Sequence, residues 1–343
     1  MPIKRRLALL CAVLCAGSAH AGIVNLTTPI GGANIYVIHD FTSYSSDVEG
    51  AIVAGGNVTL SNYAVNAKNK DAFGAKDIAV AAGGNVKLSN GSINNGLVYA
   101  GGTTSISSAP AVSSAASSPV DFKVLESYYK TLAKNLTELD PTGTVAPLWS
   151  GVKITGSGNG GVDVFNVSAD MFATSSSWTL DKLTPGETLI FNISGKSGTF
   201  NNGGIGFGPL DGYNVLFNFY EATSLNVKGV IGSVLAPYAT VSENWGVING
   251  NVIVDTWAST VQVNANHYFT AVDVKGFNDG SKPVIDLPTP PSTGGGNLPV
   301  EAPGNVQTGD VPEPGSLALL LAGAVAAAAL HRSRKRAASS ARA

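Results

Sequence analysis

A Gly-Gly-Asn block followed by alternating apolar and polar residues recurs along the early part of the chain. Residues 54–62 read AGGNVTLSN, residues 82–90 read AGGNVKLSN, and residues 100–107 read AGGTTSIS. The second and third copies begin about 18 residues apart, and a later pair of similar segments, 229–235 and 246–253, is offset by about 17 residues. A common spacing of this length is typical of one turn of a β-solenoid, in which each coil stacks on its neighbours.

Within each copy the residues are expected to alternate between the two faces of a strand. Val58 and Leu60 should point inward and Thr59 outward, because successive side chains of a strand face opposite ways. The glycines and asparagines fit corners, where a positive φ is needed. We therefore predict a mainly β fold, a β-solenoid. The alternative is a β-sandwich with similar hairpins, but hairpins would not be expected to repeat one spacing at both ends of the domain.

One amphipathic helix is predicted over residues 120–139. Residues 117–119 suit an N-cap and a first turn, and the pair Asp140-Pro141 ends the helix. The apolar stripe of this helix consists of Phe122, Leu125, Tyr129, Leu132, Leu136 and Leu139. We expect the stripe to pack along the flank of the β-structure; a partner-binding or coiled-coil helix is the alternative.

The N-terminal residues have the three parts of an export signal. Residues 4–6 are basic, residues 7–16 are apolar, and Ala19 and Ala21 form the small-x-small pattern that signal peptidase accepts. We therefore predict cleavage after Ala21. The apolar stretch is shorter than the roughly 20 residues that a spanning helix needs, which disfavours an N-terminal anchor. Both cysteines of the chain lie in this segment, so the mature protein is predicted to have no disulfide.

A proline-bounded motif precedes an apolar segment near the C-terminus. The motif consists of Val311, Pro312, Glu313 and Pro314. It is followed by an apolar stretch within residues 315–330 and by four basic residues between positions 332 and 336. Terminal cations resist translocation and stay on the cytoplasmic side of the membrane. The C-terminal segment is therefore predicted to hold the exported chain in the inner membrane.

These C-terminal features resemble the PEP-CTERM sorting signal in order and spacing. The resemblance implies recognition by an exosortase, removal of the tail, and release to the surface or extracellular matrix of a Gram-negative bacterium that makes exopolysaccharide. The inner-membrane anchor formed by residues 315–330 is then transient. A permanent tail anchor is the alternative, although the segment is rich in alanine and short for stable spanning.

The composition of the chain changes between the β-rich part and the sorting signal. Proline and glycine crowd residues 276–310, which have almost no apolar periodicity and are predicted to form a linker. We therefore predict a signal peptide at 1–21, an extracellular β domain at 22–275, this linker, and a sorting signal at 311–343.

Several segments of the β domain together resemble the choice-of-anchor A domain. They are the VEG-to-GGNV region at 47–58, the second Gly-Gly-Asn-Val copy, the helix, and the GSVLAPYA segment at 232–239. That family joins similar domains to different surface anchors, and some members occur in proteins described as collagen-binding adhesins. The Leu-Ala-Pro segment and the Gly-x-Ile-x-Gly-x-Val that follows it are also similar to the ice-binding-like β-solenoid, which has a helix along its flank. Neither resemblance implies catalytic residues.

Few groups in the β domain suit catalysis or metal binding. Its two histidines, His39 and His267, lack any metal-ligand spacing, and no basic stripe suits nucleic acid. Its carboxylates are scattered, whereas solenoid hydrolases use paired or clustered ones. The glycine-rich stretch 156–161 lacks the lysine of a phosphate loop and is interpreted as a tight turn. We therefore predict no enzymatic activity, no cofactor and no metal; a glycan-cleaving enzyme is the alternative.

Five aromatic residues are candidates for stacking on sugar rings, because aromatic faces offer apolar contact beside polar edges. They are Tyr63, Tyr99, Tyr238, Trp245 and Trp257. The competing interpretation is that they cover a solenoid end or pack under a loop. We expect a non-catalytic surface protein that associates with exopolysaccharide or a matrix protein. Ice binding is a further alternative, but the outward residues Thr59, Lys87 and Ser105 do not form a regular Thr-x-Thr array.

Overall fold

The computed structural model describes residues 21–68, 78–200, 205–227, 229–242 and 245–278. All of them lie in the compact unit Met1–Pro290. Ala19, the sorting motif at 311–314 and the apolar segment 315–330 lie outside the described residues. None of the helices formed by the described residues is long and apolar enough to cross a membrane.

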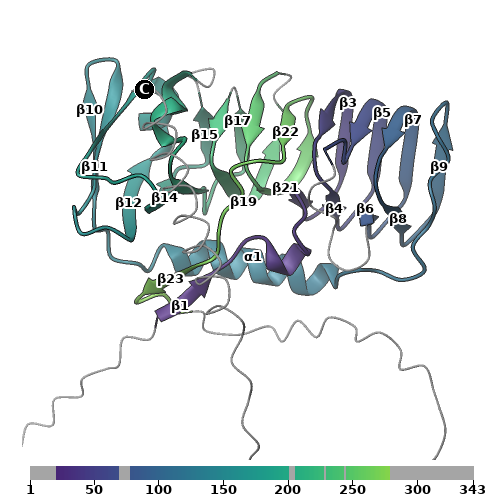
Figure 1. The fold of residues 1–343 in the computed structure, drawn as a ribbon, viewed down its shortest axis with the longest axis horizontal. Helices are drawn as coiled ribbons and strands as arrows, with labels where there is room; N and C mark the ends of the chain where they lie inside the picture. Colours follow the sequence, from purple (N-terminus) through teal and green to yellow (C-terminus); the bar gives the residue numbers. More distant parts are fainter. Residues whose placement is uncertain (1–20, 69–77, 201–204, 228, 243–244, 279–343) are drawn as a thin grey trace, which may run out of the picture. The chain divides into compact units, whose positions relative to one another are not determined.

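A parallel ladder of strands lies directly above helix α1 in Figure 1 and forms the base of the domain. In spatial order this base ladder consists of β12 (Val162–Ser168), β14 (Thr188–Ser194), β16 (Asn214–Asn218), β19 (Ser233–Val241), β21 (Val252–Ala258), β2 (Ile35–Val37), β4 (Ile52–Ala54), β6 (Ile78–Ala82) and β8 (Leu97–Ala100). Each strand pairs in parallel with its neighbours. We call each passage of the chain through this ladder and the ladders above it a winding, and neighbouring windings lie side by side.

Two further parallel ladders close the windings above the base. One consists of β15 (Ser197–Phe200), β17 (Ser224–Val227), the ends of β19 and β21, β3 (Phe41–Val48), β5 (Val58–Val65), β7 (Val86–Ile93) and β9 (Thr104–Ser107). The other, shorter one consists of β18 (Val230–Ile231), β20 (Val247–Asn249) and β22 (Gln262–Asn264), and it joins β3 at Val48.

The windings are not stacked in the order of the sequence. The chain starts in the middle of the base ladder with β2 and winds outward to β9. Helix α1 (Phe122–Leu136) then runs under the base ladder, and the strands from β12 onward wind back toward the middle (Figure 1). There β21 pairs with β2, with Val252 opposite Ile35, and β22 meets β3. The first and last windings are therefore neighbours.

Antiparallel pairing is confined to two places among the described residues. The strands β1 (Ala21–Val24) and β23 (Val272–Lys275) form one antiparallel pair, and the strands β10 (Thr144–Leu148) and β11 (Gly151–Thr155) form a hairpin. The strand β13 (Trp178–Asp181) pairs in parallel with β11. The prediction of a mainly β fold is confirmed, and the parallel ladders differ from the hairpins that a sandwich would require.

Helix α1 begins later than the sequence suggested. Its N-cap is Asp121, whose Oδ1 accepts hydrogen bonds from the backbone N–H of Lys123 at 3.0 Å and of Val124 at 3.1 Å. The assignment of the N-cap to 117–119 is therefore wrong, because a carboxylate further on satisfies the first free N–H groups. The other helices formed by described residues are the short α2 (Ala169–Thr174) and the 3₁₀ turns η1 (Thr28–Ile30) and η3 (Ile205–Leu210).

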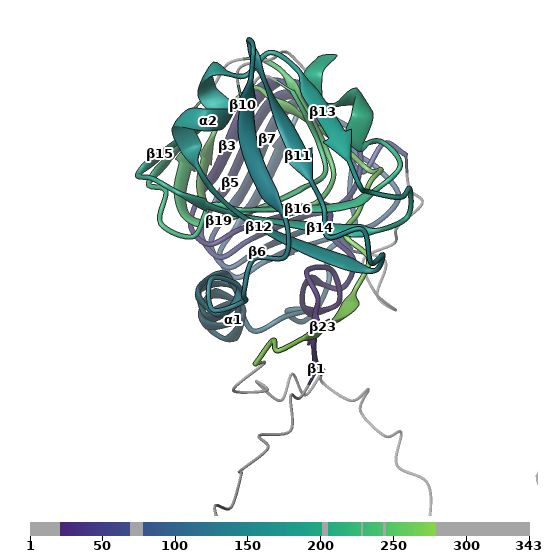
Figure 2. The ribbon, with the colours of Figure 1, turned by 90° about the vertical axis from the view of Figure 1, so that its left-hand side faces the viewer.

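The base ladder is buried on both faces. In β2, Ile35 and Val37 point into the windings, while Tyr36 points toward the helix and its ring centroid lies 5.3 Å from that of Tyr129. The base strands β2, β4 and β6 carry unbroken apolar runs, as parallel strands covered on both sides do. The apolar stripe of α1 packs against the face of the base ladder that is turned toward the helix, as predicted. Leu125, Leu132 and Leu136 are among its buried residues. Figure 2 shows the helix against this ladder.

The Gly-Gly-Asn blocks form a corner at which successive windings approach closely. A Cβ on Gly83 would overlap the backbone carbonyl oxygen of Gly55, and a Cβ on Gly101 would overlap that of Gly83. None of these three glycines has a positive φ. The expectation of left-handed corners is therefore wrong for them, because glycine is required here by the close approach of two backbones.

The asparagines of the same blocks form a chain of hydrogen bonds across the windings. The backbone N–H and the side-chain amide of Asn57 both donate to Asp40 Oδ1, at 2.6 and 3.1 Å. Asn85 repeats the arrangement on Asn57 Oδ1, at 2.9 and 3.1 Å. A left-handed corner is found instead at Asn62 and Asn90, whose φ values are 51° and 60°. The asparagine side chains thus fix the register of one winding on the next.

Candidate binding site

Two of the five candidate aromatics are in the core. Trp257 is 0% exposed and stacks on Phe41 with parallel rings whose centroids are 5.8 Å apart. Tyr63 is also buried, and burial raises the pKa of its phenol. The prediction that these two residues contact a ligand is wrong. For Tyr63 the reason is local: the left-handed Asn62 interrupts the alternation of β5, so that Tyr63 rather than its predecessor points inward.

The other three candidates keep at least part of their surface exposed. Tyr99 of β8 is half-buried and packs against the helix-side core. Tyr238 of β19 is exposed, and the Lys130 Nζ of α1 lies 5.4 Å from its ring centroid. Trp245 precedes β20 and is 54% exposed. Contact of these three side chains with a ligand stays a prediction.

The most exposed large aromatic side chain of the described residues is Trp149, which the sequence did not single out. It is 95% exposed and lies in the two-residue turn of the β10–β11 hairpin, where Leu148 pairs with Gly151. Its φ of 53° is left-handed, a conformation that costs about 1 kcal/mol for a residue with a Cβ. The turn lacks the Asn-Gly or Asp-Gly pair that signals a hairpin, and this is why the sequence did not reveal it.

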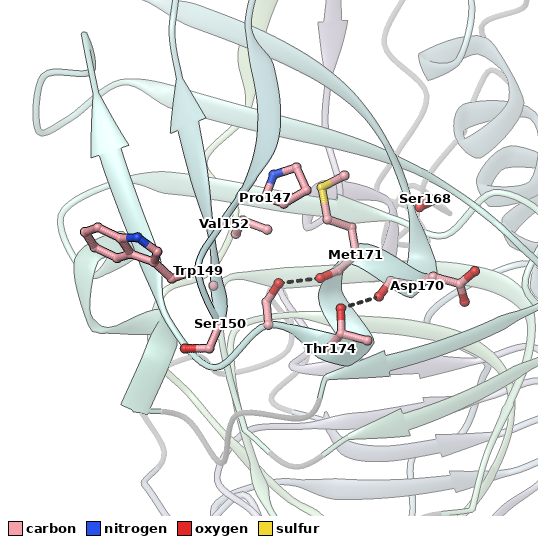
Figure 3. Close-up of a pocket in the computed structure, with 10 residues that line it drawn as sticks. Pro147, Trp149, Ser150, Val152, Ser168, Asp170, Met171 and Thr174 are labelled. Carbon is pink, nitrogen blue, oxygen red and sulfur yellow. Dashed lines mark hydrogen bonds between the residues drawn. The ribbon is translucent and has the colours of Figure 1, made fainter.

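An open pocket of about 360 Å³ lies beside this turn. The strands β10 and β11 lie at the end of the domain that faces the viewer in Figure 2. It is lined by Pro147, Trp149, Ser150, Gly151, Val152, Ser168, Asp170, Met171, Thr174 and Ser175. The hairpin supplies one wall, with Trp149, and the end of β12 together with α2 supplies the other (Figure 3). The hydroxyl of Thr174 donates to the backbone oxygen of Asp170 at 3.0 Å, which stabilises α2.

The chemistry of the pocket suits binding. An indole face, aliphatic side chains and several hydroxyls line it, together with one carboxylate, that of Asp170. No histidine or cysteine is among the lining residues. Elsewhere, His39 and His267 each bond a carboxylate, Asp255 and Asp211 respectively, at 2.9 and 2.8 Å. Within the described ranges no group of three or more His, Cys, Asp or Glu residues is placed to hold a metal ion.

Residues 27–265 match the family model described as "Putative Ice-binding-like adhesive domain". The chain belongs to this family. The match covers the base ladder, α1, the hairpin and the pocket of the ice-binding-like adhesive domain, and it leaves out β1 and β23. No curated protein and no solved structure shows a significant match.

A second family model matches the C-terminal residues. Residues 310–335 match the PEP-CTERM protein-sorting motif, in agreement with the motif at 311–314. This signal indicates an exported protein that is sorted to the cell envelope or surface, and it implies processing by an exosortase.

Proposed function

We propose that the domain is an ice-binding-like β-solenoid that acts as a non-catalytic adhesive module in the matrix of a Gram-negative bacterium, where it binds exopolysaccharide or a matrix protein. The observation that carries the proposal is the fully exposed Trp149 at the rim of a pocket in an ice-binding-like adhesive domain. The parallel ladders support the solenoid, because each winding pairs in register with the next. We also propose that the domain is related to choice-of-anchor A domains, and the stacked Gly-Gly-Asn corners support this relationship.

A sugar is the ligand class that the pocket suits best. A pyranose ring has an apolar C–H face, which stacks on an indole, and a rim of hydroxyls, which need donors and acceptors. Trp149 offers the flat face, and Ser150, Ser168 and Asp170 offer polar atoms around it. The hairpin tip is reachable from solvent, so an extended polysaccharide can bind without entering the domain.

The lining of the pocket favours binding over hydrolysis. Glycoside hydrolases generally use two carboxyl groups on opposite sides of the scissile bond. Asp170 is the one carboxylate among the lining residues. Glycan cleavage is therefore the weaker alternative for this site.

Ice binding is also less well supported. An ice-binding surface needs a regular array of hydroxyl groups on a flat face, and one outward row starts in this way, with Thr42 opposite Thr59. The next residue in the row is Lys87, followed by Ser105. The long, charged side chain of Lys87 interrupts the row of hydroxyl groups.

Replacing Trp149 by alanine is expected to weaken binding to the exopolysaccharide of the producing strain about tenfold, which corresponds to about 1.4 kcal/mol. Affinity electrophoresis of the secreted protein in gels that contain the polysaccharide measures the change. Trp149→Phe keeps an aromatic face and should retain most of the affinity. Tyr44→Ala removes another exposed aromatic side chain, on β3 and outside the pocket lining, and should leave the affinity unchanged. Equal binding by the Trp149→Ala variant and the wild type would contradict a glycan site at the pocket.

The mature extracellular protein is expected to begin at Gly22 and to lack the residues that follow the sorting motif. Both ends follow from the predicted signal-peptidase site after Ala21 and from exosortase processing. Intact-mass measurement of the protein recovered from the medium checks them together, and the same protein from a strain without exosortase should retain its tail. Extracellular material with an intact C-terminus through Ala343 would rule out tail removal.

A further inference from the structure

Glu187 is a buried carboxylate without a partner. It is 6% exposed, and neither of its carboxylate oxygens has a hydrogen-bond partner. None of the ion pairs formed among the described residues includes it. Burial of an ionised carboxylate is costly unless a positive charge or several donors compensate it. A bound cation would compensate the charge of an ionised Glu187.

A glycine-rich loop, residues 157–161, lies directly beside this carboxylate. Glu187 immediately precedes β14, and the N–H of the next residue, Thr188, donates to the backbone oxygen of Gly161 at 2.8 Å. A Cβ on Gly160 would lie 3.8 Å from Glu187 Oε1. Gly158, Gly160 and Gly161 all have positive φ, and the loop is largely exposed to solvent. The exposed backbone of this loop thus lies next to a buried carboxylate.

A second buried carboxylate holds the loop in place. Both oxygens of Asp163 lie 3.1 Å from the backbone nitrogen of Ser157, which donates to them, and Asp163 Oδ1 also accepts from Thr142 Oγ1 at 2.7 Å. Within the loop, the N–H of Asn159 donates to Ser157 Oγ at 3.2 Å. Asp163 thus anchors the start of the loop, whereas the carboxylate of Glu187 makes no hydrogen bond to it.

We propose that Glu187 and the loop 157–161 bind a calcium ion. Calcium takes six to eight oxygen ligands from carboxylates, backbone carbonyls and water in flexible geometry, so one carboxylate and a glycine-rich loop suit it better than they suit an ion that requires a rigid octahedron. The site has oxygen donors and no histidine or cysteine, which disfavours zinc or copper. Asp163 is a positioning residue that fixes the loop. Calcium binding would neutralise the buried charge and tie β12 to β14 at one corner of the domain.

Thermal unfolding of the secreted protein, freed of divalent ions by a chelator, tests the proposal. With calcium chloride added to about 10 mM, the midpoint is expected to rise by about 5 °C if the affinity resembles that of extracellular calcium modules. Glu187→Gln keeps the size of the side chain but should abolish the rise. Glu221→Gln is the matched control, because Glu221 is already paired with Lys196 at 3.2 Å and bonded to Gly195 N at 2.8 Å, and it should leave the rise intact.

Terbium luminescence provides a second readout that does not depend on the stability of the variants. Tyr213 lies next to Asn214, whose backbone N–H donates to the backbone oxygen of Glu187 at 3.0 Å, and burial and Glu187 raise the pKa of the Tyr213 phenol. Terbium bound at the site should emit when tyrosine is excited, and calcium should displace it. Tyr213→Phe should lower the emission without removing the thermal response to calcium.

Three outcomes would overturn the inference. The first is a wild-type protein whose unfolding midpoint does not respond to calcium and which binds no terbium that calcium displaces. The second is a Glu187→Gln variant that responds to calcium like the wild type. The third is an equal rise with magnesium chloride, which would indicate a general effect of divalent ions instead of a calcium site.

Discussion

A Gly83→Ala substitution is expected to lower the free energy of unfolding by more than about 3 kcal/mol, above the ordinary range for overpacking. The added Cβ would overlap the carbonyl oxygen of Gly55 in the preceding winding. Gly83 N also donates to the backbone oxygen of Ala54 at 2.9 Å, so the two backbones cannot separate without loss of that bond. Because the obstructing atom belongs to backbone, no side-chain rotation relieves the overlap. Urea denaturation followed by far-ultraviolet circular dichroism measures the loss, and low solubility on expression is a second sign of it.

Gly208→Ala is the matched control for this experiment. A Cβ on Gly208 would meet no atom within 4 Å, and its φ is not positive, so the variant should be as stable as the wild type to within about 0.5 kcal/mol. Wild-type stability of the Gly83→Ala variant would show that the windings are further apart than the structure has them.

A Trp257→Ala substitution is expected to destabilise the domain by about 3–5 kcal/mol, the usual cost of removing a large aromatic side chain from a core. Trp257 is completely buried, stacks on Phe41, and donates its indole N–H to the backbone oxygen of Ser259 at 3.1 Å. It also lies at the seam between the last windings and the first, where β21 pairs with β3. The substitution therefore leaves a cavity at the place where the two halves of the domain meet.

Trp245→Ala removes the same side chain from the surface and should cost about 1 kcal/mol or less. Both variants lose the same tryptophan side chain, so the difference between their free energies of unfolding, measured by urea denaturation, reports the effect of burial. If both variants lost the same stability, Trp257 would not lie in the core.

The sequence contained much of the local structure of the windings. Each Gly-Gly-Asn copy has glycine where two backbones approach and asparagine where a side chain bonds the next winding, so similar copies predict similar, stacked strands. The stripe of α1 was readable in the same way, because burial of one helix face requires a 3.6-residue period. The N-cap could not be predicted in this way, because the serines at positions 117–118 are as good a cap by residue type as Asp121.

The candidate site was much less predictable. Burial of Tyr63 depends on a single left-handed residue, Asn62, that changes the phase of the strand. Trp149 is exposed because a hairpin projects it from the end of the domain, and residue type alone does not reveal such a position. Glu187 looks like one of many scattered carboxylates until the strands beside it bury it against a glycine-rich loop.

The amino-acid sequence by itself determined that this chain is mainly β, that one helix packs by a single face, and that the C-terminus carries a sorting signal. Each of these properties is encoded by neighbours in the sequence, through period, composition or motif. Only the tertiary structure decided that the first winding lies beside the last, with the Asn251 side chain donating to the backbone oxygen of Ala33 at 3.1 Å. The spatial order of the windings depends on which strand edges are buried together when strands far apart in the sequence pair. Such burial is a property of the whole domain, so no local segment of the sequence encodes it.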